Sequence, residues 1–199
     1  MESKKIIPYN TQYTDSKDIK SLIDLFNSGG FLTCGPKVSE FENKICQYTG
    51  AKYGVAVSNG TAALHIACLA LGLTKDDEVI VPAISFAASS NCVLYCGAKP
   101  VFCDIEENTL NIDCSKIEEL ITEKTKAIIA VDMGGQMCDY HNLQKICDKY
   151  KLVLIEDAAH SIGAKEKNCP HTPYVGSFAD MTTFSFHPVK NITTGEGGM

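Results

Sequence analysis

Lys190 is the first residue whose position suggests chemistry. It follows the apolar, strand-like run MTTFSF (181–186) and precedes the glycine-rich stretch TTGEGG (193–198). A lysine amine held beside a strand end can attack a carbonyl carbon as a nucleophile. Most lysines are solvated surface residues, so Lys190 alone does not establish a reactive site.

Two adjacent carboxylates, Glu156 and Asp157, end the apolar run LVLI (152–155). Successive side chains of a strand point to opposite faces, so the two carboxylates must lie in different surroundings. A carboxylate on a buried strand needs a partner, because burying an unpaired charge is costly. A protonated ring nitrogen of a ligand would be such a partner for Asp157.

The stretch SNGTAA (58–63) is a candidate phosphate-binding turn. It follows the apolar run YGVAV (53–57) and opens a helical pattern. Gly60 lets the backbone approach a ligand, and Thr61 lies at a helix N-terminus, whose N–H groups and dipole attract phosphate. Taken alone, the stretch is more typical of a simple N-cap, because the sequence contains neither GxGxxG nor GxxxxGK[ST].

Two more candidates lie at or just after the ends of predicted strands. Phe86 comes after EVIVP (78–82), where its ring could stack on a flat ligand or equally belong to the core, and Ser185 lies near Lys190. Ligands of open α/β sheets bind at the carboxyl ends of the strands, so all these residues are expected at one edge. A phosphate cradle, a stacking aromatic ring, a carboxylate and a lysine are the parts of a pyridoxal phosphate site.

The elements that must position these groups alternate regularly along the chain. Apolar runs rich in β-branched residues are separated by helix-length stretches, which indicates an α/β fold with a mainly parallel sheet covered on both faces. No internal repeat or interdomain linker interrupts the pattern. The expected strands are 53–57, 78–82, 100–105, 127–132, 152–158 and 181–186.

Helical patterns occupy much of the remaining chain. The first helix is capped by Asp15 or Ser16, and the second follows Pro36. Three more helices are expected over 61–71, 87–96 and 140–149. The apolar face of the first helix consists of Ile19, Leu22, Ile23 and Phe26.

Composition restricts the class of protein and its partners. The 199 residues are 45% hydrophobic and 21% charged, which is ordinary for a globular core. The net charge of −6 argues against nucleic acid as the main partner, because no basic stripe can neutralise phosphates. With no signal peptide and no run near the ~18 apolar residues of a membrane helix, we expect a cytoplasmic protein without a membrane partner.

Ten cysteines occur without any CxxC pair. A disulfide framework is not expected without an export signal, and Cys92 with Cys96 lacks the second pair or histidine partner of a zinc site. Most of the cysteines lie in apolar runs, where a free thiol behaves as a small hydrophobic group. We therefore expect reduced, mostly buried thiols and no metal.

Four longer stretches carry a resemblance to a known family: SNGTAALHIACLALGL, DEVIVPAISFAASSNCVLYCGAKPVFCDI, IEDAAHSIGA and FSFHPVKNITTGEGGM. The chain resembles the DegT/StrS family of nucleotide-sugar aminotransferases, which have the aspartate-aminotransferase fold, fold type I of the pyridoxal phosphate enzymes. The resemblance spans nearly the whole sequence. It implies that residues 1–199 form the N-terminal part of the cofactor-binding large domain and end before the small C-terminal domain.

The resemblance also implies individual roles. Lys190 would bind pyridoxal phosphate covalently and move protons, while Asp157 would keep the pyridinium nitrogen protonated. Phe86 would stack on the ring, and His160, where many relatives have Gln, would reach the ring hydroxyl. The phosphate would be held by Gly60, Thr61, Ala62 and Ser185.

The activity implied by the resemblance is transfer of an amino group from L-glutamate to a keto-sugar, with pyridoxamine phosphate as the intermediate form of the cofactor. The stretches 91–102 and 184–198 look most like members of the pseudaminic-acid pathway. The expected acceptor is therefore carbon four of a UDP-linked 4-keto-6-deoxy-N-acetylhexosamine, and the product UDP-4-amino-4,6-dideoxy-N-acetyl-β-L-altrosamine. A homodimer with shared active sites is expected.

Three alternatives stay open at this point. The acceptor could be another nucleotide-linked 4-keto or 3-keto deoxysugar. A sugar dehydratase of the same fold also uses pyridoxamine phosphate, but it has histidine in place of the lysine, so Lys190 argues against it. A chain of this length could also be inactive and have a structural or regulatory role.

Overall fold

The structure, a computed structural model, describes residue 8, residues 10–166 and residues 174–199. In this part of the chain five strands form one sheet whose pairings are all parallel. The order across the sheet is β2-β1-β3-β4-β5. The α/β class and the mainly parallel sheet are thereby confirmed. The strands are β1 (Glu78–Pro82), β2 (Lys99–Cys103), β3 (Thr125–Val131), β4 (Val153–Asp157) and β5 (Met181–Thr183).

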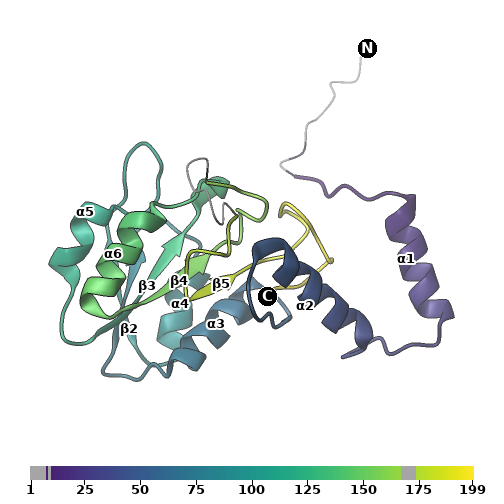
Figure 1. Ribbon diagram of the computed structural model, residues 1–199, viewed down its shortest axis with the longest axis horizontal. Helices are drawn as coiled ribbons and strands as arrows, with labels where there is room; N and C mark the ends of the chain where they lie inside the picture. Colours follow the sequence, from purple (N-terminus) through teal and green to yellow (C-terminus); the bar gives the residue numbers. More distant parts are fainter. Residues whose placement is uncertain (1–7, 9, 167–173) are drawn as a thin grey trace, which may run out of the picture.

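Helices cover both faces of the sheet (Figure 1). They are α1 (Ser16–Asn27), α2 (Pro36–Thr49), α3 (Gly60–Leu71), α4 (Ala88–Tyr95), α5 (Cys114–Ile117) and α6 (Tyr140–Tyr150), with 3-10 turns η1 (Glu118–Leu120) and η2 (Met133–Gly135). α3 and α4 pack on one face, and α5 and α6 pack on the other. α2 lies beyond the β5 side of the sheet, and α1 stands farther out.

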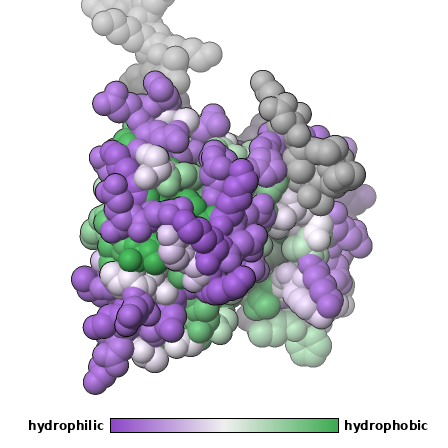
Figure 2. All heavy atoms as spheres, turned by 60° about the vertical axis from the view of Figure 1, so that its left-hand side comes forward, coloured by the Kyte–Doolittle hydropathy of each residue, from purple (hydrophilic) through white to green (hydrophobic). Residues whose placement is uncertain are grey.

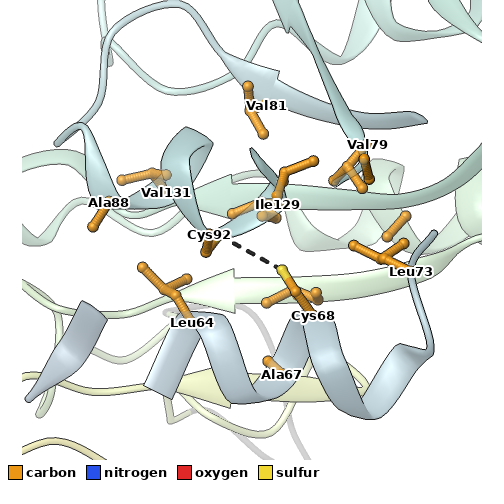
Figure 3. Close-up of a cluster of buried hydrophobic side chains, with 14 residues drawn as sticks. Leu64, Ala67, Cys68, Leu73, Val79, Val81, Ala88, Cys92, Ile129 and Val131 are labelled. Atoms are coloured by element: carbon orange, nitrogen blue, oxygen red, sulfur yellow. Dashed lines mark hydrogen bonds between the residues drawn. The ribbon is translucent and has the colours of Figure 1, made fainter. Parts of the chain in front are cut away.

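Each face of the sheet has its own apolar core. Figure 3 shows Leu64 and Cys68 of α3 meeting Cys92 of α4 beneath Val79 and Ile129 of the sheet. All five side chains are almost fully buried. The sulfur atoms of Cys68 and Cys92 lie 3.6 Å apart, within reach of a weak S–H···S hydrogen bond. This core attaches α3 and α4 to the sheet.

The cysteines largely match the expected burial. The nine described cysteines are free thiols, whereas Cys169 lies outside the described residues. Cys34 is exposed, contrary to the general expectation, because it lies in the turn between α1 and α2. The buried thiols are Cys68, Cys92, Cys103, Cys138 and Cys147.

The prediction of a strand over residues 53–57 is wrong. Only Val57 pairs, through a single antiparallel bridge to Gly198, and Gly198 in turn bridges Ser185 beyond β5. The pairing therefore depends on a backbone partner far away in the sequence rather than on the apolar run itself. The run still borders the sheet, because the Val57 and Gly198 backbones exchange two hydrogen bonds of 2.9 Å.

The first helix begins as predicted but does not bury its apolar face. The Asp15 side chain accepts hydrogen bonds from the Lys17 and Asp18 N–H groups at 2.7 and 3.2 Å, which confirms Asp15 as the N-cap. No α1 residue is buried among the described residues, because α1 lies away from the sheet. The side chains expected to pack are more than half exposed, namely Ile19, Leu22, Ile23 and Phe26.

The molecular surface over α5 and α6 is mainly hydrophilic. Figure 2 shows this side with hydrophilic residues surrounding smaller hydrophobic patches. Within the described part of the chain, no helix has the length and apolar character to cross a membrane.

The alternation predicted for Glu156 and Asp157 is confirmed. Asp157 points toward α4, where the Ser89 hydroxyl donates to it. Glu156 points the other way, and its Oε2 accepts from the Gly176 N–H at 3.0 Å and the Thr182 hydroxyl at 2.7 Å. The second oxygen, Oε1, is buried without a hydrogen bond from any described residue. Glu156 is therefore an incompletely satisfied buried carboxyl group.

Burial is the main cause that raises the pKa of Glu156 to about 7, and the nearby Asp132 carboxylate adds to the rise. Asp132 is itself fully buried, with Oδ1 accepting from the Tyr140 hydroxyl at 2.8 Å and Oδ2 from the Ser161 hydroxyl at 2.7 Å. Two close buried carboxylates cannot both be charged without a large cost. The fold therefore favours a proton on Glu156.

We expect the free energy of unfolding to fall as the pH rises from 4.5, the usual pKa, to about 7. In this range the folded state keeps a proton on Glu156 that the unfolded state has lost, so this group lowers stability by up to about 1.4 kcal/mol per pH unit. Glu156→Gln removes the titration but keeps an oxygen acceptor for Gly176 and Thr182. Urea unfolding at several pH values in this range should therefore show a shallower fall for the variant.

Glu78→Gln is the matched control. The Glu78 carboxylate pairs with Lys99 at 2.9 Å, and that hydrogen bond is the main cause of its lowered pKa. A group with a lowered pKa loses its stabilising effect below the usual pKa, outside this range, so the control should keep the wild-type slope. Identical slopes for wild type and Glu156→Gln would contradict a protonated Glu156.

Candidate active site

A cavity of about 670 Å³ opens beside the carboxyl ends of β3, β4 and β5 and the loop after β1. The chain leaves β1 for β2 on one side and later returns to β3 on the other, and ligands of open α/β sheets bind at such a reversal. Ala62 belongs to the same turn as two of the lining residues but does not line the cavity. The predicted residues that line it are Gly60, Thr61, Phe86, Asp157, His160, Ser185 and Lys190.

The N-terminus of α3 forms the anion-attracting end of the cavity. Within the described residues, the backbone N–H groups of Gly60 and Thr61 donate to no acceptor, and the Thr61 and Ser185 hydroxyls make no hydrogen bond. A Cβ atom on Gly60 would lie 2.9 Å from the Ser185 Cβ, which is too close, so glycine is the residue that fits at this position. This contact brings the helix end and Ser185 together.

Asn59 explains why Ala62 differs from its neighbours. Its side-chain Oδ1 accepts the Ala62 N–H at 2.8 Å and so caps α3. The Ala62 amide is thus used within the turn, and its predicted contact with a phosphate would compete with this cap. Asn59 also lines the cavity, and an asparagine just before a helical pattern is a recognisable sequence signal.

Asp157 is a buried acidic residue in the wall of the cavity and is only 4% exposed. The Ser89 hydroxyl donates to Oδ2 at 2.6 Å, and the Ala159 N–H donates to Oδ1 at 3.2 Å. Burial raises the pKa of Asp157, whereas the Ser89 hydrogen bond and the charges of His160 and Lys190 oppose the rise. The carboxylate is held in one orientation and can accept a further cationic donor from the cavity.

Lys190 lies in the turn after β5, where its backbone N–H donates to the His187 carbonyl at 2.9 Å. Its side chain is half-buried, and its amine has no hydrogen bond or ion pair within the described residues. Burial lowers the pKa of the amine, although Asp157 partly opposes this effect. A larger fraction of neutral amine makes Lys190 a better nucleophile and base.

His160 lines the same cavity and interacts electrostatically with both Lys190 and Asp157. Burial lowers the pKa of its imidazole and the Lys190 charge lowers it further, whereas Asp157 acts in the opposite direction. The turn η2 packs against its backbone, since a Cβ on Gly135 would lie 2.9 Å from the His160 carbonyl oxygen. Gly135 also has φ of 87°, which favours glycine. The histidine is therefore a mostly neutral group on a fixed backbone.

Phe86 borders the open side of the cavity and is 73% exposed. Its ring makes no aromatic contact with another described residue. The sequence left two interpretations of Phe86 open, and the one that placed its ring in the core is contradicted by this large exposure. Its stacking on a ligand stays a prediction.

The structure also adds residues that sequence reasoning missed. Ser89 lies inside α4 and reaches Asp157, a contact without any local sequence signal. Glu196 lines the cavity from the glycine-rich stretch, with its Oε1 3.7 Å from the Nε2 of His187. Ser89 and Asp157 are 68 positions apart in the sequence, and Glu196 lies in a stretch without a helix or strand. The spacing of residues could therefore not reveal either contact.

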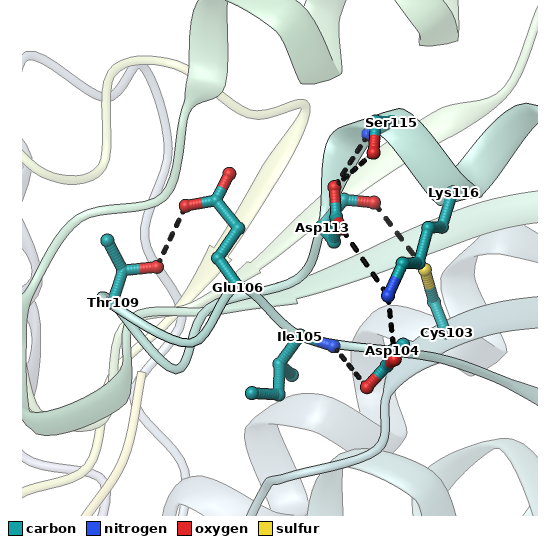
Figure 4. Close-up of polar contacts among 8 residues, drawn as sticks. All are labelled: Cys103, Asp104, Ile105, Glu106, Thr109, Asp113, Ser115 and Lys116. Carbon is teal, nitrogen blue, oxygen red and sulfur yellow. Dashed lines mark hydrogen bonds and ion pairs between the residues drawn. The ribbon is translucent and has the colours of Figure 1, made fainter.

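The loop after β2 contributes nothing to the cavity. Lys116 lies between Asp104 and Asp113, with N–O distances of 2.7 and 3.7 Å, and the Thr109 hydroxyl donates to Glu106 at 3.1 Å (Figure 4). These side chains satisfy one another around the loop rather than facing the cavity. The polar groups available for chemistry are those at the ends of the other strands.

The cavity thus offers three different groups to one ligand. Gly60, Thr61 and Ser185 suit a phosphate, the buried Asp157 suits a cation, and Lys190 offers an amine. A molecule that carries a phosphate, a basic ring nitrogen and a carbonyl group has one feature for each of them. No simple N-cap or surface lysine requires this combination.

Comparisons with known proteins agree with this arrangement. Residues 12–199 match the family model described as the DegT/DnrJ/EryC1/StrS aminotransferase family. A solved structure titled a putative sugar aminotransferase Spr1654 from Streptococcus pneumoniae, in the PMP-form, has a TM-score of 0.90 and 37% identity, covering 96% of this chain and 51% of that one. Helicobacter pylori PseC, titled an aminotransferase of pseudoaminic acid biosynthesis, has a TM-score of 0.90 and 36% identity, covering 98% and 51%.

A curated relative, GDP-perosamine synthase of Vibrio cholerae, is 42% identical over 194 residues, which are 98% of this chain and 52% of that protein. The chain therefore spans about half the length of the relatives it matches. The matched residues include the whole described sheet and every residue that lines the cavity. The chain belongs to the DegT/DnrJ/EryC1/StrS aminotransferase family.

Proposed function

We propose that residues 1–199 form the N-terminal part of the pyridoxal phosphate-binding large domain of a nucleotide-sugar aminotransferase. The observation that carries the proposal is that one cavity is lined by Asp157, by Lys190 and by Gly60 and Thr61, whose N–H groups have no acceptor among the described residues. Solved relatives in PLP and PMP forms support the choice of cofactor.

The residues present fit pyridoxal phosphate. A phosphate dianion suits the N-terminus of α3, because two N–H groups at the helix end have no acceptor in the part of the chain that the structure describes. A protonated ring nitrogen suits Asp157, because a carboxylate this deeply buried is stabilised by an opposing charge. When bound, the cofactor supplies an electron sink for negative charge on the substrate carbon.

The chain's own residues then divide the work. Lys190 would hold the cofactor covalently, and its lowered pKa allows the Nζ atom to take up a proton from the substrate carbon and return it. Asp157 would keep the ring nitrogen protonated. Phe86 would cover one face of the ring and exclude water, and the mostly neutral His160 would donate a hydrogen bond to the ring hydroxyl.

For the substrates, we propose L-glutamate as the amino donor and the 4-keto carbon of a UDP-linked 4-keto-6-deoxy-N-acetylhexosamine as the acceptor. The structural likeness to PseC supports a place in pseudaminic acid biosynthesis. The whole protein would act as a homodimer with shared active sites.

A different acceptor is the main alternative. GDP-perosamine synthases of three organisms are 41–42% identical to this chain, as similar as any relative named above. A GDP-linked keto-sugar therefore competes with the UDP-linked one. A dehydratase is less well supported, because the cavity contains Lys190 where a dehydratase of this fold carries histidine.

The cofactor assignment predicts a specific covalent label. Protein carrying this sequence, incubated with pyridoxal phosphate and reduced with borohydride, should carry the pyridoxyl group on Lys190, because this amine is half-buried in the cavity with a lowered pKa. Peptide mass mapping locates the label. Lys165 is the internal control, since its pKa is raised and its amine lies over the Tyr174 ring at 4.4 Å. A label on Lys165 instead of Lys190 would contradict the site.

The acceptor assignment predicts a sugar preference. With L-glutamate, release of 2-oxoglutarate should be fastest with the UDP-linked L-arabino 4-keto sugar, and its D-xylo epimer should be slower by about tenfold or more. GDP-4-keto-6-deoxymannose is the comparison substrate for the perosamine alternative. Preference for either competitor would keep the aminotransferase proposal and reject the pseudaminic acid pathway.

A further inference from the structure

Two hydroxyl groups connect the cavity wall to the buried Asp157. The Ser85 hydroxyl donates to the Ser89 oxygen at 2.7 Å, and the Ser89 hydroxyl donates to Asp157 Oδ2 at 2.6 Å. Ser85 lines the cavity, whereas Ser89 is 0% exposed and lies in the first turn of α4. The two hydroxyl groups therefore form a row of hydrogen bonds that runs from the cavity into the protein interior.

The direction of these hydrogen bonds is determined by the proton count. An ionised Asp157 carboxylate has no proton to donate, so the single Ser89 proton goes to Oδ2 and the Ser89 oxygen accepts from Ser85. The Phe86 carbonyl, at 3.1 Å, is a second acceptor for the Ser85 hydroxyl. The Ala159 N–H occupies the other carboxylate oxygen at 3.2 Å. With one donor on each oxygen, the plane of the Asp157 carboxylate is fixed relative to β4 and α4.

We propose that Ser89 is a positioning residue for the reaction: its hydroxyl, oriented by Ser85, keeps Asp157 ionised and directed at the ring nitrogen of the cofactor. This inference rests on the proposed function, because it takes the ring nitrogen as the partner of Asp157. Ser89 itself is buried and does not line the cavity.

The charges around Asp157 explain why a hydroxyl is needed. Lys190 and His160 face the carboxylate from the cavity side and favour its charged form, but burial acts against them and is the largest cause of its raised pKa. On the α4 side Cys92 interacts with Asp157, and the pKa of its thiol is raised, so this group stays neutral. Ser89 is thus the only strong donor to Asp157 from that helix among the described residues.

Ser89→Ala tests the inference directly. It would leave Asp157 Oδ2 buried without a donor, so the Asp157 pKa should rise. In cofactor-free protein labelled with ¹³C at the aspartate carboxyl carbon, we expect the NMR titration of Asp157 to shift upward, with Asp157→Asn identifying the signal. Binding of pyridoxal phosphate should weaken about tenfold or more, the usual effect of losing a hydrogen bond to a charged group.

Two variants provide controls. Ser90→Ala removes a hydroxyl from the next position of α4 that donates only to the Ala87 carbonyl, at 3.1 Å, and it should change neither readout. Ser85→Ala should raise the Asp157 titration less than Ser89→Ala. Because Ser85 lines the cavity, the Ser85→Ala variant still tests the inference if Ser89→Ala does not fold.

A double-mutant cycle separates positioning from packing. In the Asp157→Asn background, Ser89→Ala should weaken cofactor binding little further, because the group that Ser89 orients is already changed. Additive losses in this cycle would overturn the role of Ser89. An Asp157 titration that is unchanged in both serine variants, while wild-type protein binds pyridoxal phosphate, would do the same. Either result would leave the proposed function standing. Failure of wild-type protein to bind pyridoxal phosphate would overturn the proposed function together with this role.

Discussion

The burial of Asp157 is the constraint on which the rest of the site depends. A carboxylate at the end of a parallel strand that has neighbours on both sides loses its hydration, so the fold must provide donors and positive charge around it. α4 supplies the Ser89 hydroxyl, the following turn supplies the Ala159 N–H, and the cavity side supplies Lys190. The same burial that raises the pKa of Asp157 also lowers the pKa of the Lys190 amine, because both groups share one partly dehydrated space.

The sheet topology brings these groups together from distant parts of the chain. Parallel strands place all their carboxyl ends at one edge, and the β1–β3 reversal leaves room there for a ligand. The glycine-rich stretch after Lys190 completes the arrangement, because Gly198 passes between Val57 and Ser185. A Cβ at Gly198 would overlap the Asn59 carbonyl, so a larger residue would push the α3 turn away from Ser185.

Most of the fold and much of the candidate site could be predicted from the sequence because their signals are local. β-branched runs predicted all five strands of the sheet, and residues after strand ends predicted seven of the residues that line the cavity. The errors concern non-local partners. The run 53–57 reads as a strand, yet its pairing depends on Gly198, and the apolar pattern of α1 does not reveal what would cover it. Ser89 escaped detection because a serine inside a helix gives no sign of a carboxylate on a strand 68 positions away.

We propose that one cavity binds the phosphate and the ring nitrogen of pyridoxal phosphate at two separate protein groups. A crystal structure of protein carrying this sequence with pyridoxal phosphate measures this directly. We expect phosphate oxygens within hydrogen-bond distance of the Gly60 and Thr61 N–H groups, and the ring nitrogen about 2.7–2.9 Å from an Asp157 oxygen. A cofactor whose phosphate lies away from α3, or whose ring nitrogen faces solvent rather than Asp157, would show that these groups do not form the binding site.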